Sequence, residues 1–181
     1  EVPVWVWNKD RQGRINAVYD LYKNLAMRYK GKVRYYEVFS EPNLPGLGFY
    51  LENKSTRDAD YVSTYLDFLE AANKGVHEVD PSAVVMLGGL SPDGMSPAEF
   101  MARLYKLGGR DCFDVLDYHP YDSLGTAGAF KAKAVAIRNF MTNAGDYADK
   151  PIWFGELGSN IPEDQVKFLN QMKDELSAVP A

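Results

Sequence analysis

The feature that most constrains the fold is a regular alternation of short apolar runs with longer amphipathic segments. Alternation of this kind predicts a parallel β-sheet covered by helices, with right-handed connections between successive strands. The runs expected to be strands are residues 2–7, 35–41, 83–87, 113–118 and 152–154. We therefore expect an α/β fold with about five parallel strands.

The segments between these runs place apolar residues at helical spacing. The expected helices are residues 14–29, 58–76, 97–107, 129–142 and 162–179. The third helix has the clearest start, because Ser96 offers a hydroxyl cap, Pro97 suits the first helical position and Glu99 adds an acid to the first turn. No glycine-rich phosphate-binding motif follows any expected strand, which argues against a nucleotide-binding sheet.

Two glutamates close two of the expected strands. Glu41 ends the run Tyr-Tyr-Glu-Val-Phe-Ser-Glu, and Glu156 ends the run Pro-Ile-Trp-Phe-Gly-Glu. The carboxyl ends of barrel strands carry the chemistry of α/β barrels, and two carboxylates on different strands are the minimal equipment of a glycoside hydrolase. For either residue alone, a solvated loop carboxylate is the simpler interpretation.

The motifs around these glutamates resemble a known clan of enzymes. Tyr-Tyr-Glu-Val-Phe-Ser-Glu-Pro-Asn at residues 35–43 is similar to the fourth strand of the retaining glycoside hydrolases with (β/α)8 barrels. Residues 113–121, which end in His-Pro-Tyr, resemble the sixth strand, and residues 152–156 resemble the seventh. The resemblance is greatest to glycoside hydrolase family 39. It implies a partial or shortened TIM-type barrel that supplies strands three to seven, in a single catalytic domain over residues 1–181.

The same resemblance implies a function. Glu41 would be the acid/base and Glu156 the nucleophile of a retaining β-glycosidase, an enzyme that needs no cofactor. Position 40 departs from the family, since Ser40 stands where an asparagine usually contacts the sugar 2-hydroxyl. The length also departs from it, because 181 residues leave the first, second and eighth strands without a counterpart. The chain is either a fragment or a naturally shortened barrel.

Strand alternation predicts which further side chains share the face of the glutamates. Glu37 should point inward beneath Glu41, either in a structural ion pair or as a like charge that raises the pKa of Glu41. His119 should contact a sugar hydroxyl or orient a glutamate, or else fill the barrel top as an ordinary polar residue. Tyr121 should donate to the nucleophile or pack at the rim.

Sugar binding is expected from residues beside the glutamates and from aromatic rings. Ser40, Asn43 and Trp7 join His119 and Tyr121 as substrate-binding candidates. Other aromatic candidates by location are Trp5, Phe49 and Tyr50. Trp153 alternates out of register with Glu156, so we expect it to pack under a helix.

Composition excludes several classes. A net charge of −5 without a basic tract argues against nucleic acid and anionic membranes as partners. The single Cys112 and two separate histidines predict neither a disulfide nor a metal site. If an upstream signal segment was removed, the protein would be secreted or periplasmic.

Two other classes remain open. A degenerate barrel could serve as a non-catalytic carbohydrate-binding or scaffold protein, and a flavodoxin-like domain would also place five parallel strands in one sheet. The incomplete strand set leaves backbone edges unpaired, above all along residues 2–7. We therefore expect self-association, as a symmetric homodimer joined through the open barrel side.

Overall fold

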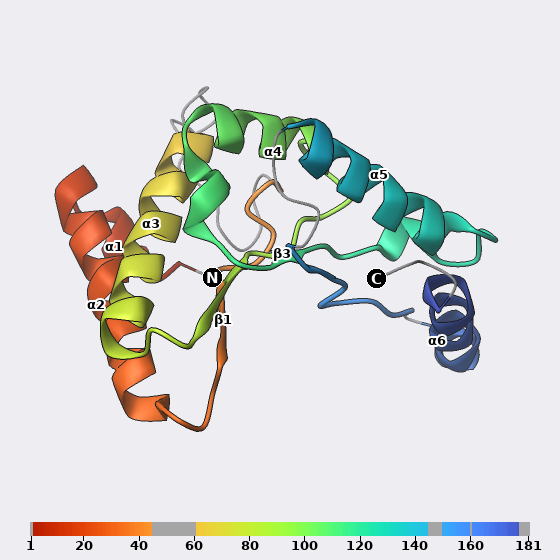
Figure 1. Ribbon diagram of the computed structural model, residues 1–181, viewed down its shortest axis with the longest axis horizontal. Coiled ribbons are helices and arrows are strands. Elements are labelled where there is room, and N and C mark those ends of the chain that lie inside the picture. Colours follow the sequence, from red (N-terminus) through yellow and green to blue (C-terminus); the bar gives the residue numbers. More distant parts are fainter. Residues whose placement is uncertain (1, 45–60, 145–149, 160, 178–181) are drawn as a thin grey trace.

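The computed structural model describes residues 2–44, 61–144, 150–159 and 161–177. Four short strands lie beneath an arc of helices (Figure 1). The strands are β1 (Tyr35–Val38), β2 (Val84–Leu87), β3 (Leu116–Asp117) and β4 (Ile152–Trp153). The α-helices are α1 (Val4–Trp7), α2 (Arg11–Tyr29), α3 (Tyr61–Val79), α4 (Pro97–Lys106), α5 (Ala129–Asn143) and α6 (Pro162–Leu176), and the 3-10 helices are η2 (Gly109–Cys112) and η3 (Tyr121–Ser123).

The strands run parallel in chain order. Pairs β1–β2 and β3–β4 are each parallel, and the parallel bridges Met86–Val115 and Leu90–Tyr118 join β2 to the β3 segment. The result is a mixed α/β fold in which short parallel strands alternate with helices, as the sequence predicts. None of the described helices combines the length and apolar character needed to cross a bilayer.

The run at residues 2–7 is the clear correction, because Val4–Trp7 form helix α1 and no part of the run forms a strand. The Val6 N–H donates to the Pro3 carbonyl and the Asn8 N–H donates to the Val4 carbonyl, so the turn satisfies its own backbone. Val4 is 61% exposed although Val2 and Val6 are buried, so the run lacks the period of two that a strand would show. The described residues therefore contain four strands where five were expected.

Specific local contacts position the helices of the outer layer. Gly75 of α3 lets α2 approach, since a Cβ there would lie 2.7 Å from the Tyr19 carbonyl oxygen. Ser96 caps α4 as predicted, its hydroxyl accepting from the Glu99 N–H at 3.2 Å. At the other end of the chain, the Glu175 carboxylate of α6 accepts from the Gly128 N–H at the start of α5.

The sheet is strongly curled. The rings of Tyr35 and Trp153 lie 4.7 Å apart although β1 and β4 are the two outer strands of the series. Three strand spacings of about 4.8 Å would separate these side chains in a flat sheet. The contact therefore requires the concave face to close on itself, and this face is the one without helices (Figure 1).

Trp153 lies on this concave face. The sequence pattern predicted instead that it would pack under a helix, and that prediction was wrong. Its register partner in β3 is Asp117, and paired residues of parallel strands point to the same side. Phe154, the next residue, takes the helix-facing position and contacts Tyr118 and Phe130. Trp153 remains 39% exposed because no strand covers it from the open side within the described residues.

Candidate active site

Glu41 and Glu156 meet at the same end of the sheet, around one imidazole. Glu41 follows β1 and Glu156 follows β4, each by three residues. His119 Nδ1 lies 3.1 Å from Glu41 Oε1 and 3.7 Å from Glu156 Oε2. The distance between Glu41 Oε1 and Glu156 Oε2 therefore cannot exceed the sum of these two distances. That sum lies below ~9.5 Å, the largest separation of the two catalytic carboxyl groups in glycoside hydrolases.

A tight turn presents Glu41. Phe39 and Glu41 have φ values of 56° and 49°, in the left-handed region that costs a residue with a side chain about 1–2 kcal/mol. Tertiary hydrogen bonds hold this turn: the Phe39 N–H donates to the Tyr22 hydroxyl, and the Glu41 N–H donates to the Gly89 carbonyl at 2.9 Å. The turn aims the Glu41 carboxylate at His119.

His119 is completely buried and linked to the sheet through its backbone. Its N–H donates to the Leu90 carbonyl at 2.9 Å. With Glu41 Oε1 as the acceptor of the hydrogen bond from the ring, the assigned tautomer has its ring proton on Nδ1. Gly89 makes room for the ring, since a Cβ at that position would lie 1.9 Å from His119 Nε2.

Tyr121 stands beside Glu156. Its hydroxyl donates to Glu156 Oε2 over a long 3.5 Å, and its ring meets the His119 ring edge-on at 6.4 Å between centroids. Burial raises the pKa of Tyr121, and the neighbouring Glu156 carboxylate adds to this rise. The phenol therefore stays protonated and able to donate. An open hollow of about 610 Å³ begins at Tyr121 and runs along α6 to Phe168.

The other substrate-binding candidates are placed differently. Ser40 is half-buried directly before Glu41. Asn43 is fully buried: its amide donates to the carbonyls of Ser91 and Met95, both at 2.7 Å, and accepts from the Ser91 N–H at 2.8 Å. These bonds hold the loop after β1 against residues 91–95, so Asn43 acts as a clamp between two loops.

Trp7 is not brought to the carboxylates. Its ring packs against Phe68 of α3 at 5.6 Å, with the Arg14 guanidinium over it, inside the helical layer. Trp5 is 55% exposed on α1. Phe49 and Tyr50 fall in residues 45–60, outside the described residues.

Two acids complete the group, and one of them was missed as a site residue. Glu37 lies on the concave face as expected, but its partner is the Gly89 N–H at 2.9 Å; among the described residues it forms no ion pair with lysine or arginine. Asp117 is 1% exposed, and its Oδ1 accepts from the Gly155 N–H at 2.7 Å. The available signal was an acid two residues before His119, on the same face of the expected strand.

Electrostatics of these acids follow from their surroundings. Desolvation by the sheet raises the pKa of Glu37, although part of its side chain reaches solvent, and the Asp117 charge adds to this rise. Burial likewise raises the pKa of Asp117. The site thus places four carboxyl groups around a single histidine.

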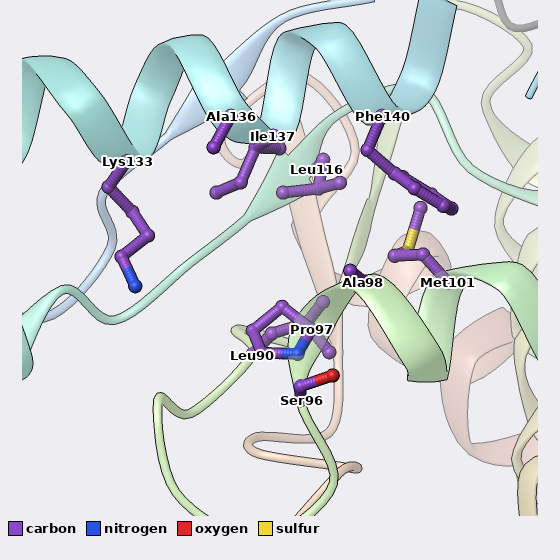
Figure 2. Close-up of a pocket in the computed structure, with 10 residues that line it drawn as sticks. All are labelled: Leu90, Ser96, Pro97, Ala98, Met101, Leu116, Lys133, Ala136, Ile137 and Phe140. Atoms are coloured by element: carbon purple, nitrogen blue, oxygen red, sulfur yellow. The ribbon is translucent and has the colours of Figure 1, made fainter. Parts of the chain in front are cut away.

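A separate apolar cavity lies away from this group. It has a volume of about 220 Å³ and lies between α4 and α5, where Leu116, Ile137 and Phe140 line it and Lys133 stands at one side (Figure 2). Neither Glu41 nor Glu156 lines it. This space separates two helices of the outer layer, and no aspartate or glutamate is among the described residues that line it.

Comparisons with known proteins concern the fold. No protein-family model matches the chain, and no curated protein matches it. A glucosidase from Croceicoccus marinus, solved by crystallography, is similar in structure, with a TM-score of 0.60 and 15% sequence identity. The match covers 94% of this chain and 36% of the glucosidase, so the chain spans little more than a third of that protein's length. At this identity the likeness shows a shared fold alone.

Proposed function

We propose that the chain forms four consecutive β/α units of an eight-stranded barrel, as a single domain over residues 1–181, and carries the catalytic pair of a retaining β-glycosidase. The parallel order β1-β2-β3-β4, the single helical layer and the inward curl support the barrel assignment. With helix α1 in place of the first expected strand, β1 to β4 correspond to the fourth to seventh strands of such a barrel.

The observation that carries the function is the meeting of Glu41 and Glu156 at His119 Nδ1. Glu41 acts as the acid/base: the His119 N–H holds Oε1, which leaves Oε2 to carry the proton to the glycosidic oxygen. Glu156 attacks the anomeric carbon and forms the covalent glycosyl intermediate. Tyr121 donates to Glu156 and orients it for this attack.

In the second step Glu41 reverses its role. As a carboxylate it takes a proton from water, and the resulting nucleophile releases the sugar from Glu156. The His119 N–H stabilises the Glu41 carboxylate that exists between the two steps, because hydrogen bonding to the charged form favours that form. The open hollow beside Tyr121 offers space for the sugar chain.

The substrate class is a β-linked oligo- or polysaccharide, so the protein takes part in carbohydrate degradation. The glucosidase neighbour makes aryl β-glucosides the first substrates to test. Since the chain spans about a third of that protein, we expect weak turnover unless the remaining strands are supplied.

The test is a pair of variants assayed on aryl β-glycosides with good and poor leaving groups. Glu156→Ala should abolish turnover of all substrates, because no covalent intermediate can form. Glu41→Ala should spare the first step on good leaving groups, which need little protonation, and azide should restore the second step. Glu163→Ala, which removes an exposed glutamate in the first turn of α6, is the matched control and should leave turnover unchanged.

Equal loss by Glu41→Ala on good and poor leaving groups would contradict the acid/base role. A non-catalytic carbohydrate-binding protein is the second candidate, favoured by Ser40 and by the four-strand set of the described residues. Binding of oligosaccharides without hydrolysis by the wild-type chain would select it.

A further inference from the structure

Three polar side chains converge on the concave face beneath the catalytic pair. Glu37 comes from β1, Asp117 from β3 and His119 from the segment after β3. One potential ligand atom from each lies within 4.8 Å of the other two. This group is distinct from the Glu41–Glu156 pair, although His119 belongs to both through its two ring nitrogens.

Each of the three residues is held by its other polar atom. Glu37 Oε1 accepts from the Gly89 N–H, and Asp117 Oδ1 accepts from the Gly155 N–H. His119 Nδ1 donates to Glu41. These bonds leave Glu37 Oε2, Asp117 Oδ2 and His119 Nε2 as the potential ligand atoms. Metal ligands are commonly oriented in this way, with a hydrogen bond to the atom that does not bind the ion.

His119 Nε2 is an independent indication of a ligand. The side chain is 0% exposed, and Nε2 has no hydrogen-bond partner among the described residues. Its recorded neighbour is Asp117 Oδ2 at 3.8 Å, beyond hydrogen-bond distance. With the ring proton on Nδ1, Nε2 presents a lone pair, and an electron-pair acceptor would satisfy it.

Charge points to the same kind of ligand. Across the described ranges, neither Glu37 nor Asp117 pairs with a lysine or arginine, so two carboxyl groups lie beside His119 Nε2 without a cation. A bound cation would neutralise both acids and accept the imidazole lone pair at once. A water molecule would satisfy Nε2 but would leave the two acids uncompensated.

Two glycines leave the space beside these atoms free of side chains. A Cβ at Gly89 would lie 1.9 Å from His119 Nε2, and a Cβ at Gly155 would lie 2.2 Å from Asp117 Oδ2. Any other residue at either position would displace the potential ligand atom. The ligands of a tetrahedral zinc ion lie about 3.4 Å apart, so we expect the three atoms to draw closer on binding, with the exposed Glu37 moving most.

We propose that Glu37, Asp117 and His119 bind a divalent cation of the zinc class, with water completing its coordination. One imidazole nitrogen and two carboxylate oxygens suit zinc or cobalt better than calcium or magnesium, which prefer oxygen alone. The ion would keep the His119 proton on Nδ1 and so maintain the hydrogen bond to Glu41. The cation site goes beyond the proposed hydrolase activity and does not depend on it.

Calorimetric titration of the chelator-treated chain with zinc chloride at neutral pH tests this site. The wild type should bind one ion per chain. Glu37→Gln and Asp117→Asn should each weaken the affinity by at least about 10-fold, because each removes a charged ligand. His77→Gln is the matched control, since His77 is the only other histidine and lies 3.9 Å from an acid, Asp114.

Cobalt absorption provides a second readout, with the intense visible bands of a four-coordinate site expected for the wild type and lost in Glu37→Gln. Circular dichroism confirms folding of each variant, and the exposed Glu37 makes its variant the least disruptive. Absence of zinc binding, equal affinity in all variants, or loss of binding in His77→Gln would overturn the proposal.

Zinc binding is measured without substrate, so its outcome is separate from the glycosidase assay. Glu156→Ala should bind zinc with wild-type affinity while being inactive. If no variant or wild-type chain hydrolyses a glycoside but zinc binding follows Glu37 and Asp117, the hydrolase proposal fails and the cation site stands. The reverse pattern removes the cation site alone.

Discussion

Replacing Asn43 by alanine should separate a structural role from a role in substrate binding. The side chain makes three short hydrogen bonds to the backbone of residues 91–95, and both Asn43 and Ser91 are buried. Each bond contributes about 1 kcal/mol, and the buried backbone groups left without partners add a desolvation cost of about 1–3 kcal/mol. We expect the free energy of unfolding to fall by about 4–6 kcal/mol.

Urea denaturation followed by circular dichroism measures this change. Asn73→Ala is the matched control, because the half-buried helical Asn73 has one backbone partner, the Cys112 carbonyl at 3.0 Å, and one side-chain partner, His77 Nδ1 at 3.2 Å. Its cost should stay near 1 kcal/mol, since alanine also favours the helix. An Asn43→Ala loss below about 1 kcal/mol, combined with a raised KM, would refute the clamp and restore Asn43 as a substrate residue.

Three further predictions concern the same face. Gly89→Ala should displace the His119 ring and lower the free energy of unfolding by about 1–3 kcal/mol, and wild-type stability in urea would contradict the packing described. Because the folded-state pKa of Asp117 is raised, its contribution to stability is present below the unfolded pKa and is lost as pH rises through the folded pKa. Asp117→Asn should therefore show a smaller fall in urea stability than the wild type as pH rises from about 4 to neutral, and parallel pH profiles would disprove this. Finally, the exposed concave face and the edges of β1 and β4 should pair two chains into a dimer, and light scattering that finds only a 20.3 kDa monomer at raised concentration would rule this out.

The sequence predicted those features of the fold that depend on a few adjacent residues. Ser96, Pro97 and Glu99 start α4 as expected, because a helix start depends on a few adjacent residues. The placement of Glu41 and Glu156 at one end of the sheet also followed from the sequence, since parallel strands bring their carboxyl ends to the same edge. The nearness of Tyr121 to Glu156 follows from the same reasoning.

Other features required the tertiary structure. A four-residue run of alternating valine and tryptophan fits a strand or one helical turn. The hydrogen bond from the Asn8 N–H to the Val4 carbonyl identifies the helix. Trp153 was assigned to the wrong face because the alternation counted back from Glu156 ends where β4 ends, and only the pairing with Asp117 fixes its direction.

The grouping of polar side chains is the part that sequence reasoning resolves least. Glu37 and His119 are separated by 82 positions in the chain, and they meet because β1, β2 and the β3 segment pair in order and then curl. Asn43 reads as a polar loop residue until its three backbone partners are known. The sequence by itself determined which polar side chains follow the strands and at which edge of the sheet they gather. The curl and register of the sheet decided which of them touch, because such contacts depend on strand pairings between residues far apart in the chain.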